Sequence, residues 1–206
     1  MELRFKNQLL KLKTKTKRKK KNKICFVGAT RGIGVTHISL SIANFLHSVE
    51  KRKVLYIEVG ESSRLMPIIG KKEVWLGDIL VYEYKGVYYL LASSINETSR
   101  AINMIDADII VDLGMYNADT KEILLQCDKK VLVLSLQSWM IEKTTSAMRE
   151  INKRYDIREI ILLDNLTSKQ RKKGKLDQYD FYDIPFIENP FMLEESDFKA
   201  LEKVLA

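Results

Sequence analysis

The sequence is poor in the residues that build disulfide frameworks, metal clusters and membrane spans. Its 206 residues include two cysteines, three prolines and two histidines, and no apolar run approaches the roughly 18 residues that a membrane helix needs. Cys25 and Cys127 lie in or beside apolar segments without metal-ligand spacing, so we expect two buried free thiols. The basic N-terminus lacks an apolar core and a small-residue cleavage site, which argues against a secretory signal. These absences predict a cytoplasmic protein in a reducing compartment.

Charge is distributed unevenly along the chain. The formal net charge is +8, yet residues 1–23 alone hold 11 Lys or Arg and one acid, Glu2, which is +10. Residues 24–206 hold 24 basic and 26 acidic residues, a net charge of −2. With 46% hydrophobic and 30% charged residues, the composition is typical of a globular protein. We therefore expect a basic arm over residues 1–22 and a single domain over residues 23–206.

The arm is dominated by lysines between Lys11 and Lys21 and cannot bury an apolar face, which predicts disorder. Three roles for the arm remain open. Leucines and a phenylalanine before the lysine block favour an anionic membrane surface or an acidic protein partner. The same charges would also give salt-sensitive, sequence-blind binding to nucleic acid. The third role is a solvated tail. The first would place the protein peripherally at the inner face of the membrane.

Beyond the arm, continuous apolar runs alternate with helical segments. Runs of Val, Ile and Leu without alternation indicate strands covered on both faces. The pattern predicts an α/β fold with a doubly wound, mostly parallel sheet flanked by helices. We expect strands over 23–28, 54–59, 81–84, 87–91, 107–112, 130–135, 159–165 and 184–190, a surface excursion over 167–183, and helices over 36–49, 138–155 and 197–205.

A glycine-containing loop joins the first strand to the first helix. It reads Ala-Thr-Arg-Gly-Ile-Gly-Val-Thr-His over residues 29–37. Strand, glycine loop and helix together favour phosphate binding, because backbone N–H groups at a helix N-terminus attract anions. The residue before Thr36, where a phosphate-binding loop carries its lysine, is Val35. The alternative is a loop in which Gly32 and Gly34 serve only the tight turn.

Two further strands end in carboxylates, Glu58 and Asp112. Carboxyl ends of parallel strands meet at one edge of a sheet. The hydroxyl of Thr36 with these two carboxylates is a suitable oxygen set for Mg²⁺ beside nucleotide phosphates. Each acid is also open to a plain structural role at a strand end.

The order of these motifs resembles the MinD/ParA family of P-loop ATPases over about residues 23–195. The family's loop reads Gly-Lys-Gly-Gly-Val-Gly-Lys-Thr-Thr and aligns with residues 29–37, and Asp108–Gly114 is similar to its Walker B strand. The resemblance implies a homodimer and ATP or ADP bound with Mg²⁺. It implies a metal site of Thr36, Glu58 and Asp112, and nucleotide contacts from Thr30, Arg31, Gly32, Ile33, Gly34, Val35, Thr36, His37 and Asn165, with Asn165 near the adenine.

Departures from the family pattern fall on its charged positions. The signature lysine is replaced by Thr30, the phosphate lysine by Val35, and the acid that orients the attacking water by Gly60. Each lost charge-assisted hydrogen bond removes about 1.5–3 kcal/mol. We expect nucleotide binding that is weak or absent, and no significant ATP hydrolysis. The resemblance is greatest to the TadZ/CpaE branch, which localises pilus-assembly machinery.

Other roles stay open beside this one. A partition-type DNA-binding protein would use the arm on phosphates, and an unusual ATPase would use Arg31, or an arginine of another subunit, as its cation. We expect His37 to be a surface residue at the helix start. Trp75 and Trp139 are expected in the core or an interface, with residues 139–141 open to self-association.

Overall fold

The computed structural model describes residues 21–165, 176 and 178–205. One nine-stranded sheet has the order β3-β4-β5-β2-β6-β1-β7-β8-β9. Seven neighbouring strands pair in parallel, namely β5, β2, β6, β1, β7, β8 and β9, whereas β3 and β4 join antiparallel at one edge. The strands are β1 Lys23–Gly28, β2 Val54–Val59, β3 Glu73–Leu76, β4 Ile79–Tyr84, β5 Val87–Ser93, β6 Asp108–Met115, β7 Lys129–Leu134, β8 Ile161–Asp164 and β9 Phe181–Asp183.

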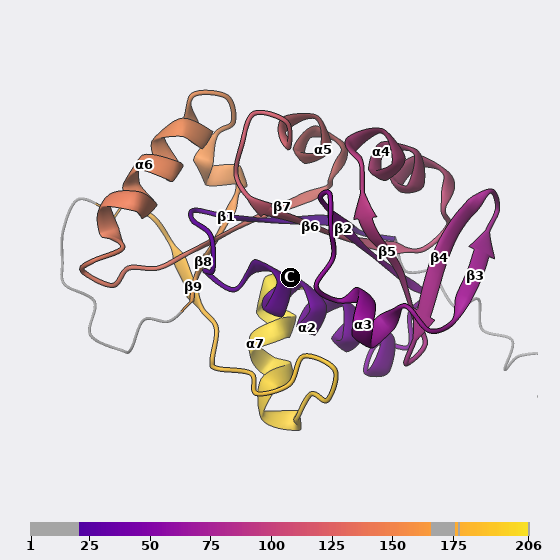
Figure 1. Ribbon diagram of the computed structural model, residues 1–206. Coiled ribbons are helices and arrows are strands. Elements are labelled where there is room, and N and C mark those ends of the chain that lie inside the picture. The colour runs from indigo at the N-terminus through magenta and orange to yellow at the C-terminus, as the bar shows by residue number, and fades with distance from the viewer. Residues whose placement is uncertain (1–20, 166–175, 177, 206) are drawn as a thin grey trace, which may run out of the picture.

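Helices cover both faces of the sheet (Figure 1). One face carries α2 (Val35–Ser48), α3 (Met66–Ile69) and α7 (Glu195–Leu205), and the other carries α4 (Ile95–Met104), α5 (Lys121–Gln126) and α6 (Ile141–Asn152). A short 3₁₀ helix, Ile157–Glu159, precedes β8. Two buried apolar clusters correspond to these two layers. The predicted doubly wound, mostly parallel α/β fold is confirmed.

The central strands are apolar at consecutive positions because both faces are covered. In β1, Ile24 and Phe26 belong to the cluster beneath α2, and Cys25 and Val27 to the opposite cluster. Helix α2 lies directly on the sheet, and ten of its residues are buried. The two cysteines are buried and free, as expected.

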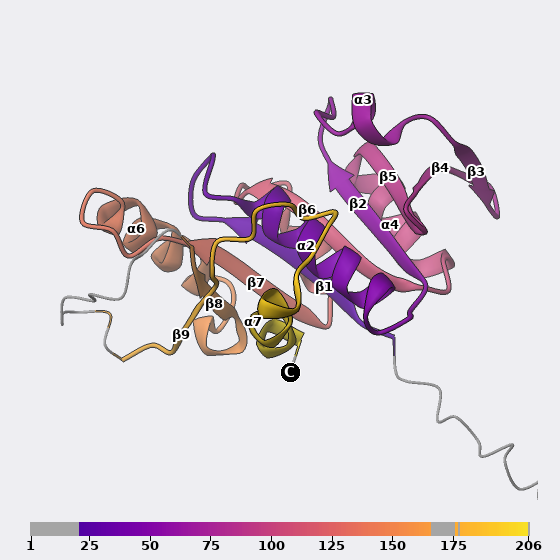
Figure 2. The ribbon, with the colours of Figure 1, turned by 90° about the horizontal axis from the view of Figure 1, so that it is seen from below.

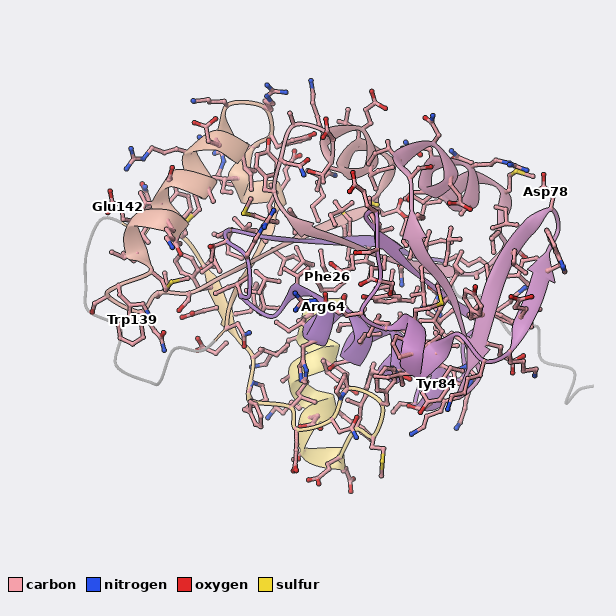
Figure 3. All side chains as sticks on the ribbon, viewed as in Figure 1. Phe26, Arg64, Asp78, Tyr84, Trp139 and Glu142 are labelled. Carbon is pink, nitrogen blue, oxygen red and sulfur yellow. The ribbon has the colours of Figure 1, made fainter. Side chains whose placement is uncertain are left out.

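The structure corrects several expectations at the periphery. The last strand is Phe181–Asp183 rather than residues 184–190, because residues 184–190 leave the sheet and turn toward α7. Strand β3 was not expected. Helix α6 is shorter than predicted at both ends, beginning at Ile141. Trp75 and Trp139 are 66% and 74% exposed, so neither is a core residue; Trp139 projects at the end of the molecule that carries α6 (Figure 3).

Two expectations fall outside what the structure describes. The arm prediction concerns residues 1–22, of which Lys21 and Asn22 alone are described, and most of the excursion predicted over 167–183 is likewise undescribed. No helix within the described ranges is long and apolar enough to span a membrane.

Candidate nucleotide cradle

The loop between β1 and α2 keeps the backbone form of a phosphate cradle. Gly32 and Gly34 have φ of 75° and 97°, in the left-handed region that glycine adopts without strain. Gly34 is the N-cap of α2, and no side chain caps the helix there. The N–H groups of the first turn are therefore directed out of the helix end, where the helix dipole favours an anion.

Val35 and Ile33 make the inside of this loop apolar. Val35 is 6% and Ile33 2% exposed, and both belong to the cluster beneath α2. Their Cγ2 atoms lie 2.7 Å and 2.8 Å from the position that a Cβ on Gly28 would take. The Val35 side chain thus packs against the end of β1, and provides no hydrogen-bond donor.

Two other loop residues contribute differently. Arg31 is exposed at the tip of the loop. Thr30 is half-buried, and its carbonyl oxygen lies close to Gly28. Of the loop residues, Arg31 alone carries a positive charge, and it is held by no ion pair among the described residues.

Asp112, at the end of β6, is buried and accepts three hydrogen bonds from the chain itself. Thr36 Oγ1 donates to Oδ2 over 2.5 Å, Tyr56 Oη donates to the same oxygen over 3.0 Å, and the Gly114 N–H donates to Oδ1 over 2.9 Å. Burial raises the pKa of Asp112, and the bonds from Thr36, Gly114 and Tyr56 oppose this rise. The network links the first turn of α2 to β2 and β6.

Glu58 lies beside Asp112 on the neighbouring parallel strand, in register with it. Its Oε2 atom is buried and has no hydrogen-bond partner among the described residues. Burial raises the pKa of Glu58, a hydrogen bond from Ser63 lowers it, and the nearby negative charge of Asp112 raises it. The structure therefore brings Thr36, Glu58 and Asp112 to the end of the sheet at which the loop lies, as the sequence predicted.

These oxygens suit Mg²⁺ chemically, since the ion prefers carboxylate and hydroxyl ligands and keeps several waters. The unpartnered oxygen of Glu58 is the observation that favours a cation here. No group of three or more His, Cys, Asp or Glu side chains able to hold a metal occurs in the described part of the chain. A metal would depend on Thr36 and on ligands from outside the protein.

His37 and Asn165 hold the loop in place. Asn165 Nδ2 donates to the Ile33 carbonyl over 2.7 Å and lies against Gly34. His37 Nε2 donates to the Ile187 carbonyl over 2.6 Å, which fastens α2 to the segment between β9 and α7. His37 lies at the helix start, as expected, and it is half-buried with its ring held by this hydrogen bond. The proposed contact of Asn165 with adenine stays a prediction.

Tyr56 and Ser39 are site residues that sequence reasoning missed. Tyr56 is fully buried, and Ser39 Oγ donates to its hydroxyl over 3.4 Å. The signal was available, because residues two apart on a strand share a face. Tyr56 stands two positions before Glu58 and therefore shares its face.

Comparison with known proteins identifies the fold. No protein-family model matches the chain, and no curated protein sequence matches it. Among solved structures, a ParA family ATPase from Chlorobium tepidum TLS superposes with a TM-score of 0.64 at 15% identity, over 90% of this chain and 98% of that one.

Two further structures agree with this. A putative plasmid partition protein from Borrelia burgdorferi B31, bound to AMPPNP, gives 0.61 at 18% identity over 90% and 97% of the two chains. The septum site-determining protein MinD from Pyrococcus horikoshii OT3, complexed with Mg-ADP, gives 0.60 at 16% over 90% and 94%. The chain therefore has the fold of the ParA and MinD P-loop ATPases, and at these identities the likeness concerns the fold alone.

Proposed function

We propose that this chain is a MinD/ParA-like positioning or scaffold protein that does not hydrolyse ATP. The observation that carries the proposal is Val35: the residue at the position of the phosphate lysine is 6% exposed and packed under Gly28. Phosphoryl transfer depends on placed positive charge and an oriented water. Here the loop interior is apolar, and Gly60 stands where the family has its water-orienting acid.

We propose that nucleotide binding is weak, with ATP or ADP and Mg²⁺ as the ligands. The open N-terminus of α2 supports phosphate contacts from the backbone of residues 30–37. Thr36, Glu58 and Asp112 would hold Mg²⁺, which when bound neutralises phosphate charge. Asp112 already accepts bonds from Thr36 and Tyr56, so metal binding must compete with bonds that the protein makes to itself. Losing two charge-assisted bonds weakens affinity by roughly two to four decades.

The finer biological role follows from the arm and from the departures in the loop. We propose that residues 1–22 form a functional unit apart from the domain over 23–206, and that the arm attaches the protein to an anionic membrane surface. A degenerate loop in this fold supports a role like that of the TadZ/CpaE branch, in localising pilus or secretion machinery. We also propose a homodimer, for which the exposed Trp139 offers an apolar contact.

Two measurements on the full chain test the absence of hydrolysis. Phosphate release from Mg-ATP is expected to equal that of a Thr36→Ala/Asp112→Ala double variant. Steady release above that control would contradict the proposal. A thermal shift with Mg-ATP or Mg-ADP reports binding independently of turnover, since a ligand that binds the folded state stabilises it.

Replacing Val35 tests the cause directly. Val35→Lys restores a cation, and Val35→Met adds similar length without charge and so controls for crowding in the core. We expect Val35→Lys to bind Mg-ADP at least 10-fold more tightly than Val35→Met, as one charge-assisted bond of about 1.5–3 kcal/mol implies.

The same pair of variants distinguishes the main alternative. In an ATPase rewired around the exposed Arg31, wild-type turnover would be measurable and Val35→Lys would damage it. No detectable Mg-ADP binding in either Val35→Lys or Val35→Met, with no turnover in either, would leave the loop a purely structural turn and would refute nucleotide binding.

A further inference from the structure

The start of β1 is fastened to the sheet by three aspartates. Lys21 Nζ forms an ion pair with Asp106, the Asn22 N–H donates to Asp108 Oδ1 over 2.9 Å, and the Lys23 N–H donates to Asp128 Oδ2 over 3.0 Å.

Asp106, Asp108 and Asp128 lie at or just before the amino ends of β6 and β7. The Ile109 N–H adds a bond of 2.9 Å to the Asn22 carbonyl. The place and direction in which the chain enters β1 are therefore fixed.

The candidate cradle lies at the other end of the same strand. β1 runs from Lys23 to Gly28, and at about 3.3 Å per residue its two ends are about 17 Å apart. Figure 2 shows the start of β1 and the loop that leads into α2 on opposite sides of the molecule. That separation is about twice the Debye length of ~8 Å at physiological ionic strength.

No spacer separates the lysine block of the arm from the start of β1. Lys19, Lys20 and Lys21 directly precede Asn22, so any surface that binds these lysines is brought close to the amino ends of the strands. Apolar residues precede the block at Leu3, Phe5, Leu9, Leu10 and Leu12. A bilayer offers them an apolar phase, whereas duplex DNA does not, and this favours lipid.

We propose that the amino-terminal edge of the sheet faces an anionic lipid bilayer, and that the cradle edge faces away from it. The inference rests on the membrane role proposed for the arm, and adds the orientation. The cradle stays accessible while the arm is engaged.

Position-specific quenching tests the orientation on the full chain. Cys25 and Cys127 are buried, so a single surface cysteine can be labelled with a fluorophore. Lys53→Cys reports the amino edge and Met115→Cys the cradle edge; both side chains are exposed. On phosphatidylserine vesicles with a headgroup quencher, we expect at least threefold stronger quenching at position 53 than at position 115. Equal or reversed quenching would overturn the orientation.

A matched pair of variants tests the source of the attachment. Lys19→Gln/Lys20→Gln and Lys172→Gln/Lys173→Gln remove the same charge from the arm and from the segment after β8. We expect the arm variant to bind vesicles about 30-fold more weakly than wild type, at ~1 kcal/mol per lysine, and the second variant to bind as wild type does.

The remaining outcomes all count against the proposal. Loss of binding in the second variant would assign the attachment to a segment other than the arm, and would refute the proposed orientation. Binding to duplex DNA without binding to vesicles would refute the lipid role of the arm. Neither result bears on ATP hydrolysis, so failure here is distinguishable from failure of the non-hydrolysing cradle.

Discussion

The candidate nucleotide cradle has two halves, the loop of residues 29–37 and the strand ends that carry Glu58 and Asp112, and different kinds of side chain fill them. In the loop half, Val35 and Ile33 pack beneath Gly28, so the loop interior is apolar. In the strand half, Glu58 and Asp112 remain, and Asp112 is satisfied by bonds from Thr36, Tyr56 and Gly114. The comparison teaches that hydrogen-bond donors of the chain satisfy a buried carboxylate in one half, while apolar side chains fill the other half. Both halves hold their shape through contacts within the chain.

The largest effect is expected from breaking the loop half at Gly34. Its φ of 97° is strained for any other residue, and an added Cβ would collide with Asn165 Nδ2, which is bonded to Ile33. Gly34→Ala should therefore lower the free energy of unfolding by about 3 kcal/mol, combining backbone strain with a lost hydrogen bond. Urea denaturation measures it.

Gly32→Ala is the matched control for this change. Gly32 also has positive φ, 75°, but nothing lies within 4 Å of its added Cβ. Backbone strain alone predicts a loss of about 1 kcal/mol. Equal losses in the two variants would show that Asn165 does not brace the loop.

How far the sequence predicts this site depends on whether chain neighbours or spatial neighbours decide each feature. The alternation of apolar runs and helices gave the sheet, and the strand ends gave the meeting of Glu58 with Asp112, because register in a parallel sheet follows from buried runs. The hydrogen bond from Tyr56 to Asp112 is harder to predict, because Tyr56 stands in an apolar run and such a run indicates only core packing. The contact of His37 with Ile187 joins residues 150 positions apart, which no local pattern reveals.

The last strand was misplaced for a related reason. Residues 184–190 hold two isoleucines and a phenylalanine, yet it is Phe181–Asp183 that pairs with β8 at the edge of the sheet. An edge strand needs only one covered side, so its sequence is weakly constrained. Residues 184, 187 and 191 instead pack against the cluster beneath α2.

A smaller effect is expected from the strand half at Asp112. Oδ2 accepts bonds from both Thr36 and Tyr56. In asparagine, an NH₂ group placed at the Oδ2 position could not accept these two bonds. Asp112→Asn should destabilise the protein by about 2 kcal/mol, and Tyr56→Phe by about 1 kcal/mol.

Because Asp112 and Tyr56 share one hydrogen bond, the double variant should lose less than the two single losses together. A double-mutant cycle in urea measures a coupling of about 1 kcal/mol. Strict additivity would mean that the Tyr56 hydroxyl does not stabilise the Asp112 carboxylate, and that the strand half is held by Thr36 and Gly114 alone.

The smallest effect concerns Glu58 and has the opposite sign. Its pKa and that of Asp112 are raised above 4.5 and 3.8 respectively. At pH values between the ordinary pKa of each carboxyl and its raised pKa, the folded state binds more protons than the unfolded state. The free energy of unfolding therefore rises as pH falls through this range. Glu58→Gln removes the buried charge, and should stabilise the protein at pH 7 by up to about 1 kcal/mol while flattening the pH profile.

Urea titrations from pH 7.5 to pH 4.5 compare wild type, Glu58→Gln and Glu61→Gln, where the exposed Glu61 controls for the loss of one negative charge. The difference between wild type and Glu58→Gln should shrink on acidification, because protonation of Glu58 removes the same charge that the substitution removes. Added Mg²⁺ sharpens the comparison, since a cation held by Glu58 would stabilise wild type at pH 7 and leave Glu58→Gln unchanged. A stability difference between wild type and Glu58→Gln that does not change with pH would show that Glu58 is a solvated acid at a strand end. Equal stabilisation of wild type and Glu58→Gln by Mg²⁺ would show the same. The strand half would then be as closed to ligands as the loop half.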